Sequence, residues 1–91
     1  MPKILLTAQV QDGSKWEQSF RTHGELLKSM TSTAIYYTVA KENEVGMYAE
    51  VKDVAKYFEV LNSKATLEAM AQDGVKRETV KTYVLDKEFL S

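Results

Sequence analysis

The chain has 91 residues, of which 44% are hydrophobic and 27% charged, and its formal net charge is −1. This length and balance predict one globular domain over residues 1–91 and exclude the strongly basic surface of a nucleic-acid or membrane-surface binder. The absence of cysteine excludes a disulfide framework and thiolate chemistry. No apolar run is long enough for a signal peptide or a membrane span, so we expect a cytoplasmic protein without membrane contact.

The first elements along the chain are a strand and a helix. Alternating apolar residues predict a strand over 3–10. Ser14 and Glu17 then match the capping-box pattern, so we expect a helix from about Lys15 to about Met30. Helical spacing places one apolar stripe on this helix, made of Trp16, Phe20, His23, Leu27 and Met30. The opposite side of the helix is charged.

A hairpin and a second helix come next. Strands are expected over 34–41 and 45–52, joined by a turn at 42–44. Asp53 is a suitable N-cap for a helix beginning at Val54. The apolar residues of this helix are Tyr57, Phe58 and Leu61.

The last third of the chain predicts an interrupted helix and a final strand. Asn62 and Ser63 are expected to break the helix, because both residues favour local hydrogen bonds over a helix interior. A further helical segment then runs from Lys64 to a glycine cap at Gly74. Its inward residues are expected to be Leu67, Met70 and Ala71. Residues 78–85 form the fourth expected strand.

The order β-α-β-β-α-β predicts an α+β fold of the ferredoxin-like type, with a four-stranded antiparallel sheet and helices on one face. The connection rules place strands 3–10 and 45–52 in the centre of the sheet. The first helix then crosses the third and second strands. The more apolar face of the sheet should lie under the helices and carries Ile4, Leu6, Ala8, Val10, Val45, Met47 and Ala49.

The other face of the sheet is rich in tyrosine. It carries Tyr36, Tyr48 and Tyr83, and exposed aromatic patches usually mark contacts. We therefore expect two copies to pack sheet against sheet, the alternative being a monomer with a merely amphipathic outer face. Glu50 on this face should reach the rim or pair with Lys81 or another basic group, because a buried carboxylate needs a partner.

Two short motifs resemble a known superfamily. The first follows the spacing V-x-D-x-x-x-W-x-x-x-F-x-x-H and comprises Val10, Asp12, Trp16, Phe20 and His23. The second comprises Ser63, Ala69-Met70 and Gly74-Val75. Together they resemble the small dimeric α/β-barrel proteins, including antibiotic-biosynthesis-monooxygenase-like and cyclase-like members. Lys64 replaces the proline that follows the serine in that family, and Lys76-Arg77-Glu78 replaces a Gly-Pro-Pro run, so we expect these loops to differ in shape from those of the family.

The resemblance implies a homodimer whose two sheets form a barrel, with a cleft between helix and sheet in each subunit. Its members include cofactor-independent monooxygenases, polyketide cyclases, muconolactone-type isomerases, haem-handling proteins and proteins without known activity, so the fold alone does not choose a function. The leading hypothesis is a small-molecule-binding homodimer that takes an apolar or aromatic ligand. Whether it is also a cofactor-independent oxygenase, cyclase or isomerase stays open. The alternative is a non-catalytic stress or self-assembly module.

His23 is the candidate catalytic residue, because it is the one side chain that titrates naturally near neutral pH. Trp16, Phe20 and Tyr37 are candidate walls of the ligand pocket, with Tyr37 as the expected neighbour of His23. The competing interpretations are a half-buried, hydrogen-bonded histidine and an ordinary packed stripe of aromatic residues.

Motifs for metals and common cofactors are absent. One histidine and no cysteine leave no standard zinc or iron–sulfur site, and a haem held by His23 alone is the one ligation left open. The chain also contains no dinucleotide-binding glycine motif, P-loop or nucleophile elbow. We therefore expect no metal and no cofactor.

Overall fold

A computed structural model describes residues 2–90 of the chain except 24–33. Its strands form one antiparallel sheet in the order β2-β3-β1-β4. Their bounds are β1 (Lys3–Gln9), β2 (Tyr36–Val39), β3 (Glu44–Glu50) and β4 (Lys81–Leu85). This arrangement confirms the α+β ferredoxin-like fold and the central positions expected for the first and third strands.

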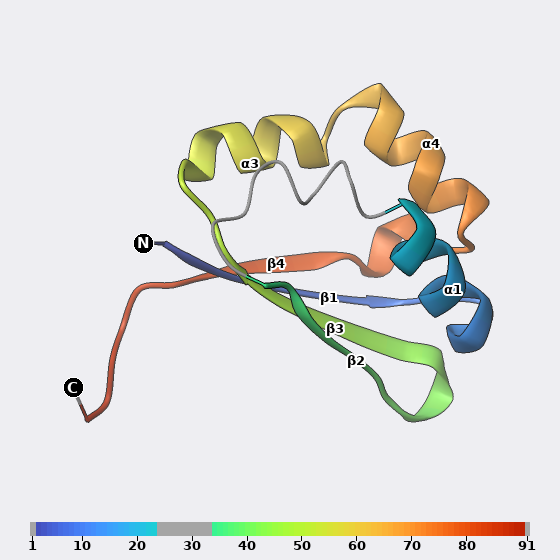
Figure 1. Cartoon of the computed structure of the whole chain (residues 1–91), viewed down its shortest axis with the longest axis horizontal. Helices are drawn as coiled ribbons and strands as arrows, with labels where there is room; N and C mark the ends of the chain where they lie inside the picture. Colours follow the sequence, from blue (N-terminus) through green and yellow to red (C-terminus); the bar gives the residue numbers. More distant parts are fainter. Residues whose placement is uncertain (1, 24–33, 91) are drawn as a thin grey trace.

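The described helices are α1 (Gly13–His23), α3 (Val54–Leu61) and α4 (Lys64–Gln72). All three lie on the same side of the sheet, with α3 and α4 forming a bent pair above β4 and β1 (Figure 1). Short 3₁₀ turns at Lys41–Asn43 and Arg77–Thr79 precede β3 and β4. The expected continuation of the first helix to Met30 falls outside the described residues.

The first helix begins at Gly13 rather than near Lys15. The Asp12 carboxylate accepts hydrogen bonds from the backbone N–H groups of Ser14 (3.0 Å) and Lys15 (3.2 Å). Asp12 is therefore the N-cap, and the expected capping box of Ser14 with Glu17 is wrong. Aspartate and serine both cap helices well, so residue type alone did not distinguish them.

All four strands are shorter than the expected ranges 3–10, 34–41, 45–52 and 78–85. The chain leaves β2 through a tight turn in which Glu42 and Asn43 adopt left-handed backbone angles, with φ of 61° and 58°. Before β4, the Thr79 hydroxyl donates to the Lys76 carbonyl (2.6 Å) and so closes a turn. These two local turns make the paired strands shorter than the alternation of apolar residues suggested.

The start of α1 packs closely on the β2–β3 hairpin. The Gly13 N–H donates to Asn43 Oδ1 at 3.0 Å. A Cβ added at Gly13 would lie 2.5 Å from Val39 Cγ1, so a larger residue does not fit unless the Val39 side chain moves. This close approach places α1 over β3 and β2, as expected.

Two caps define α4. Asn62 and Ser63 interrupt the helix as expected, and the Ser63 hydroxyl accepts from the Thr66 N–H. At the other end Gly74 has φ of +77°, and the N–H groups of Gly74 and Val75 donate to the carbonyls of Ala71 (3.2 Å) and Met70 (2.9 Å). This is a Schellman motif, and it confirms the glycine cap.

The inward side of α4 differs from the expectation. Met70 faces the core as expected, but Leu67 and Ala71 are exposed and Thr66 is buried instead. The Thr66 hydroxyl lies 3.1 Å from Ser63 Oγ, so burying this polar group does not leave it unsatisfied. Apolar residues occur all around this short helix, and they therefore did not determine which side faces the sheet.

The two faces of the sheet match the predicted division. The helix-covered face carries buried Ile4, Leu6, Ala8, Val45, Met47 and Ala49. On the uncovered face, strand pairing aligns one residue from each strand in a row: Tyr36, Tyr48, Leu5 and Tyr83. We call these four residues the tyrosine row. Tyr36 and Tyr83 are 64% and 47% exposed, so the row is open to solvent in the single chain.

Candidate functional site

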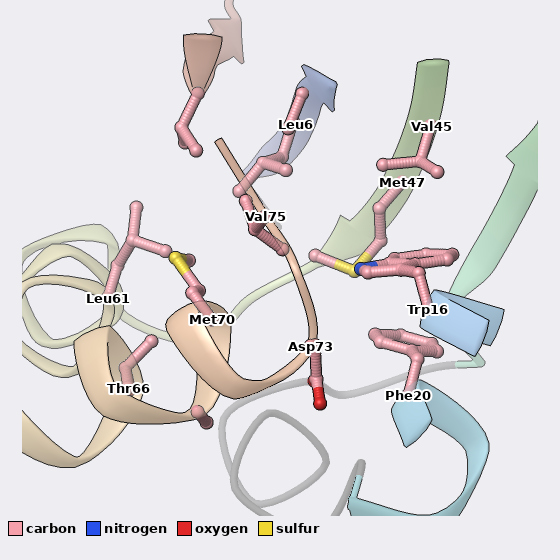
Figure 2. Close-up of a pocket in the computed structure, with 13 residues that line it drawn as sticks. Leu6, Trp16, Phe20, Val45, Met47, Leu61, Thr66, Met70, Asp73 and Val75 are labelled. Carbon is pink, nitrogen blue, oxygen red and sulfur yellow. The ribbon is translucent and has the colours of Figure 1, made fainter. Parts of the chain in front are cut away.

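A cavity of about 100 Å³ lies between the covered face of the sheet, α1 and α4. Figure 2 shows Trp16 and Phe20 on one side of it, Leu61 and Met70 on the other, and Leu6, Val45 and Met47 from the strands. The described lining is completed by Ala8, Thr66, Ala69, Asp73, Val75 and Val80. This lining is almost entirely apolar, as is usual for a small-molecule pocket.

The α1 side of the cavity is a stacked aromatic pair. Trp16 is 6% exposed, and its ring lies parallel to that of Phe20, with centroids 4.9 Å apart and an interplanar angle of 18°. The two residues are four positions apart on α1, a spacing that puts both on one side of a helix. The structure thus brings two of the three predicted wall residues, Trp16 and Phe20, to the cavity.

Tyr37 lies behind this pair rather than in the described lining. Its ring contacts those of Trp16 and Phe20, with centroid distances of 5.9 Å and 5.3 Å. Its hydroxyl donates to Glu17 Oε2 (2.7 Å) and accepts from Arg21 Nη1 (3.3 Å). Tyr37 therefore ties the edge strand β2 to α1 and supports the aromatic pair from outside.

His23 is the last residue of α1, and its side chain lies outside what the structure describes. Its predicted catalytic role and its predicted contact with Tyr37 stay predictions. The Tyr37 hydroxyl already has two described partners on α1, Glu17 and Arg21.

The α4 side of the cavity was missed at the level of sequence. Thr66, Ala69 and Asp73 line it together with the expected Met70. The usable signal was the pair Ser63 and Thr66, because the two hydroxyls of this spacing can bond to each other, and here they lie 3.1 Å apart. Val75, held by the Schellman motif, closes the end of this wall.

Asp73 is the one ionisable side chain among the described lining residues, and it is half-buried. It also borders a polar crevice of about 260 Å³ between the start of α1 and the end of α4. Figure 2 shows its carboxylate pointing away from Leu6 and Val45. Asp73 therefore lies where the apolar cavity meets the crevice.

Tyr57 of α3 is a buried polar group outside the cavity lining. It is 1% exposed, and its hydroxyl has no hydrogen-bond partner among the described residues. Burial raises the pKa of Tyr57 to about 12, because the phenolate would lose its hydration. The hydroxyl thus stays protonated at neutral pH.

The described residues contain neither a metal-binding cluster nor a membrane-spanning helix. No group of three or more His, Cys, Asp or Glu side chains there could hold a metal ion. In the same part of the chain, no helix has both the length and the apolar character to cross a bilayer.

No protein-family model and no curated protein matches the sequence. Solved structures do match over nearly the whole chain. Protein Atu4242 from Agrobacterium tumefaciens has a TM-score of 0.70 at 13% identity, covering 100% of this chain and 97% of its own. A candidate antibiotic biosynthesis monooxygenase from Bordetella bronchiseptica has a TM-score of 0.71 at 9% identity, covering 97% of each chain.

SnoaB, a cofactor-independent oxygenase from Streptomyces nogalater, is similar with a TM-score of 0.64 at 11% identity, covering 98% of this chain and 95% of its own. At such identities the likeness shows the fold. It confirms, at that level, the resemblance to antibiotic-biosynthesis-monooxygenase-like proteins found in the sequence.

Proposed function

We propose that this protein binds a small apolar or aromatic molecule in the cavity between α1, α4 and the sheet. The observation that carries the proposal is an apolar cavity bounded by the stacked rings of Trp16 and Phe20. A cavity of roughly 150 Å³ with apolar walls takes up benzene, so about 100 Å³ is close to the size of one ring. Met47 and Met70 line the space and adapt easily to a ligand because their side chains are unbranched and flexible.

A cofactor-independent oxygenase, cyclase or isomerase is the enzymatic form of this proposal. It is supported by the fold shared with SnoaB, which is itself described as a cofactor-independent oxygenase. In that form His23 is the proposed catalytic group, and Trp16 and Phe20 hold the ligand. Turnover by the wild type should be lost in His23→Ala while the oligomeric state is kept. A His23→Ala protein that unfolds would instead assign His23 a structural role.

We also propose that two copies associate through the tyrosine row. The row crosses all four strands, and Tyr36 and Tyr48 already contact each other with ring centroids 6.3 Å apart. Tyrosine suits such an interface because its ring is apolar and its hydroxyl can still find a partner. The cytoplasmic location expected from the sequence is retained as part of the proposal.

Sedimentation velocity over a concentration series tests this association. The wild type should sediment as a dimer, and Tyr83→Lys should weaken association by roughly 30-fold, the effect of losing one strong interface residue. Leu67→Lys on the exposed side of α4 is the matched control and should leave the dimer intact. A wild type that stays monomeric at high concentration would contradict the proposed dimer.

A non-catalytic self-association module is the second candidate function, and the exposed tyrosine row is the observation that favours it. The two functions differ in what they require of the cavity. A self-association module needs only packing there, whereas a binding protein needs space that a ligand can enter.

Fluorescence of Trp16 distinguishes the two functions, because it is the single tryptophan of the chain and lines the cavity. Titration with small aromatic compounds should change its emission in a saturable way. Ala69→Leu places a larger side chain in the cavity and should abolish this change, whereas Ala71→Leu on the exposed side of the same helix should not. No saturable response from the wild type to any compound would contradict the binding function.

A further inference from the structure

We propose that Asp73 makes the cavity selective for apolar ligands that carry a protonated amine. The inference rests on the proposed function, because it names the chemical class of the ligand at the same site. The apolar part of such a ligand would lie between the aromatic pair and Met70, and its ammonium group would lie at the border with the crevice.

The position of Asp73 is set by the end of α4. Asp73 is the C-cap residue, and its backbone N–H donates to the Ala69 carbonyl at 3.0 Å. The Schellman motif at Gly74 then turns the chain back toward Val75, so Asp73 is held at the corner. Its location is therefore fixed by backbone hydrogen bonds and does not depend on its own carboxylate.

The Asp73 carboxylate makes no hydrogen bond or ion pair with any described residue. It nevertheless borders an apolar cavity and is half-buried. In the single chain this carboxylate keeps contact with water, so a ligand that covers it has to supply a donor in place of that water. A charged donor from a ligand supplies the strongest compensation, since hydrogen bonds between ionised groups exceed those between neutral groups.

The end of α4 adds to the same preference. The carbonyl groups in the last turn of a helix form its negative end, which attracts cations. Asp73 lies at this end, so the helix and the carboxylate both favour a positive charge at the border of the cavity. An anionic ligand would be opposed by both.

Two other charged residues border the crevice, Asp12 and Lys15 of the α1 side. The Asp12 carboxylate is already bonded to the N–H groups that begin α1. Lys15 is the one basic residue among the described residues that line the crevice. It is exposed and forms no described ion pair with Asp73. The cavity itself is lined by Asp73 and not by Lys15, so the negative charge is the one that a bound ligand meets first.

Calorimetric titration of three compounds of similar size tests the inference: benzylamine, ethylbenzene and benzoate. The wild type should bind benzylamine about 10-fold more tightly than ethylbenzene, which has the same shape without the charge, and should bind benzoate least. Asp73→Asn keeps a side chain suited to the helix end and should remove most of the benzylamine advantage. Glu68→Gln removes an exposed charge from the same helix and should leave the advantage unchanged.

The outcomes separate the inference from the function on which it rests. Equal binding of benzylamine and ethylbenzene, or an advantage that survives Asp73→Asn, would overturn the selectivity and leave the cavity as a binding site. Failure of all three compounds to bind would count against the binding function itself.

Discussion

The two faces of the sheet are built from alternate residues of the same strands, yet they differ in what they leave open. The covered face buries its side chains beneath α1, α3 and α4, and the space that remains is a partly open cavity beside Trp16. The uncovered face leaves Tyr36 and Tyr83 largely exposed. One face is thus covered within the chain except for a small hollow, whereas the other stays open to solvent in the single chain.

This difference underlies the two kinds of binding that we propose for one small domain. The proposed ligand of about one ring would occupy the hollow under the helices, and the proposed partner copy would pack against the tyrosine row. Substitutions on the covered face should therefore act on folding and ligand binding. Substitutions on the tyrosine row should act on association.

The largest contrast is expected between Trp16→Ala and Tyr83→Ala. Trp16 is almost fully buried, so its removal should lower the free energy of unfolding by about 3–5 kcal/mol. Tyr83→Ala should lower the free energy of unfolding of the monomer by less than about 1 kcal/mol. Urea unfolding followed by circular dichroism, at a concentration below that of association, measures both values. Equal losses would mean that the two faces are not energetically distinct.

A second contrast concerns pH and the buried Tyr57 hydroxyl. Its pKa is raised from 10.0 to about 12 in the folded chain, so folded protein holds this proton above the pH at which the unfolded chain loses it. The contribution of the protonated Tyr57 to the free energy of unfolding is therefore complete below pH 10 and is lost as the pH rises toward 12. Relative to Tyr57→Phe, the wild type should lose about 2–3 kcal/mol of unfolding free energy over this interval.

Urea unfolding at several pH values between 9 and 12 gives this difference. At neutral pH, Tyr57→Phe should be as stable as the wild type or more stable, because it removes a buried hydroxyl that has no described partner. A clear loss of stability in Tyr57→Phe at pH 7 would show that the hydroxyl is hydrogen-bonded after all.

The smallest contrast compares two glycines. Gly74 has a left-handed backbone with φ of +77°, so Gly74→Ala should cost about 1–2 kcal/mol and loosen the end of α4. Gly46 lies on the uncovered face, where an added Cβ would come no closer than 3.7 Å to Thr38 Cγ2. Gly46→Ala should therefore stay within about 0.5 kcal/mol of the wild type in the same unfolding assay.

Strand alternation was enough to predict the fold and the buried face, because a residue on a strand can point to only two sides. Helical spacing placed Trp16 and Phe20 together on one side of α1, the side that lines the cavity. It failed for α4, where Leu67 and Ala71 proved exposed and Thr66 buried. Small apolar residues of α4 occur on all sides of the helix, so their periodicity does not indicate which side is buried. The orientation of the helix follows instead from the caps at its two ends.

Asp73 could not be predicted as a site residue for a similar reason. A charged residue at a helix end usually faces water, and only the turn at Gly74 brings this one to the border of the cavity. Tyr37 illustrates the opposite case. Its alternation placed it correctly on the covered face, but its hydroxyl bonds to Glu17 and Arg21 rather than pointing into the hollow.

The central claim is that the covered face takes up a small molecule and the tyrosine row does not. Methyl and aromatic NMR spectra during a titration with benzylamine test it most directly. The account predicts saturable shifts of the Met47 and Met70 methyl groups and of the Trp16 indole, with the rings of Tyr36 and Tyr83 unchanged. Shifts confined to Tyr36 and Tyr83, or unchanged Met47, Met70 and Trp16 signals, would contradict it.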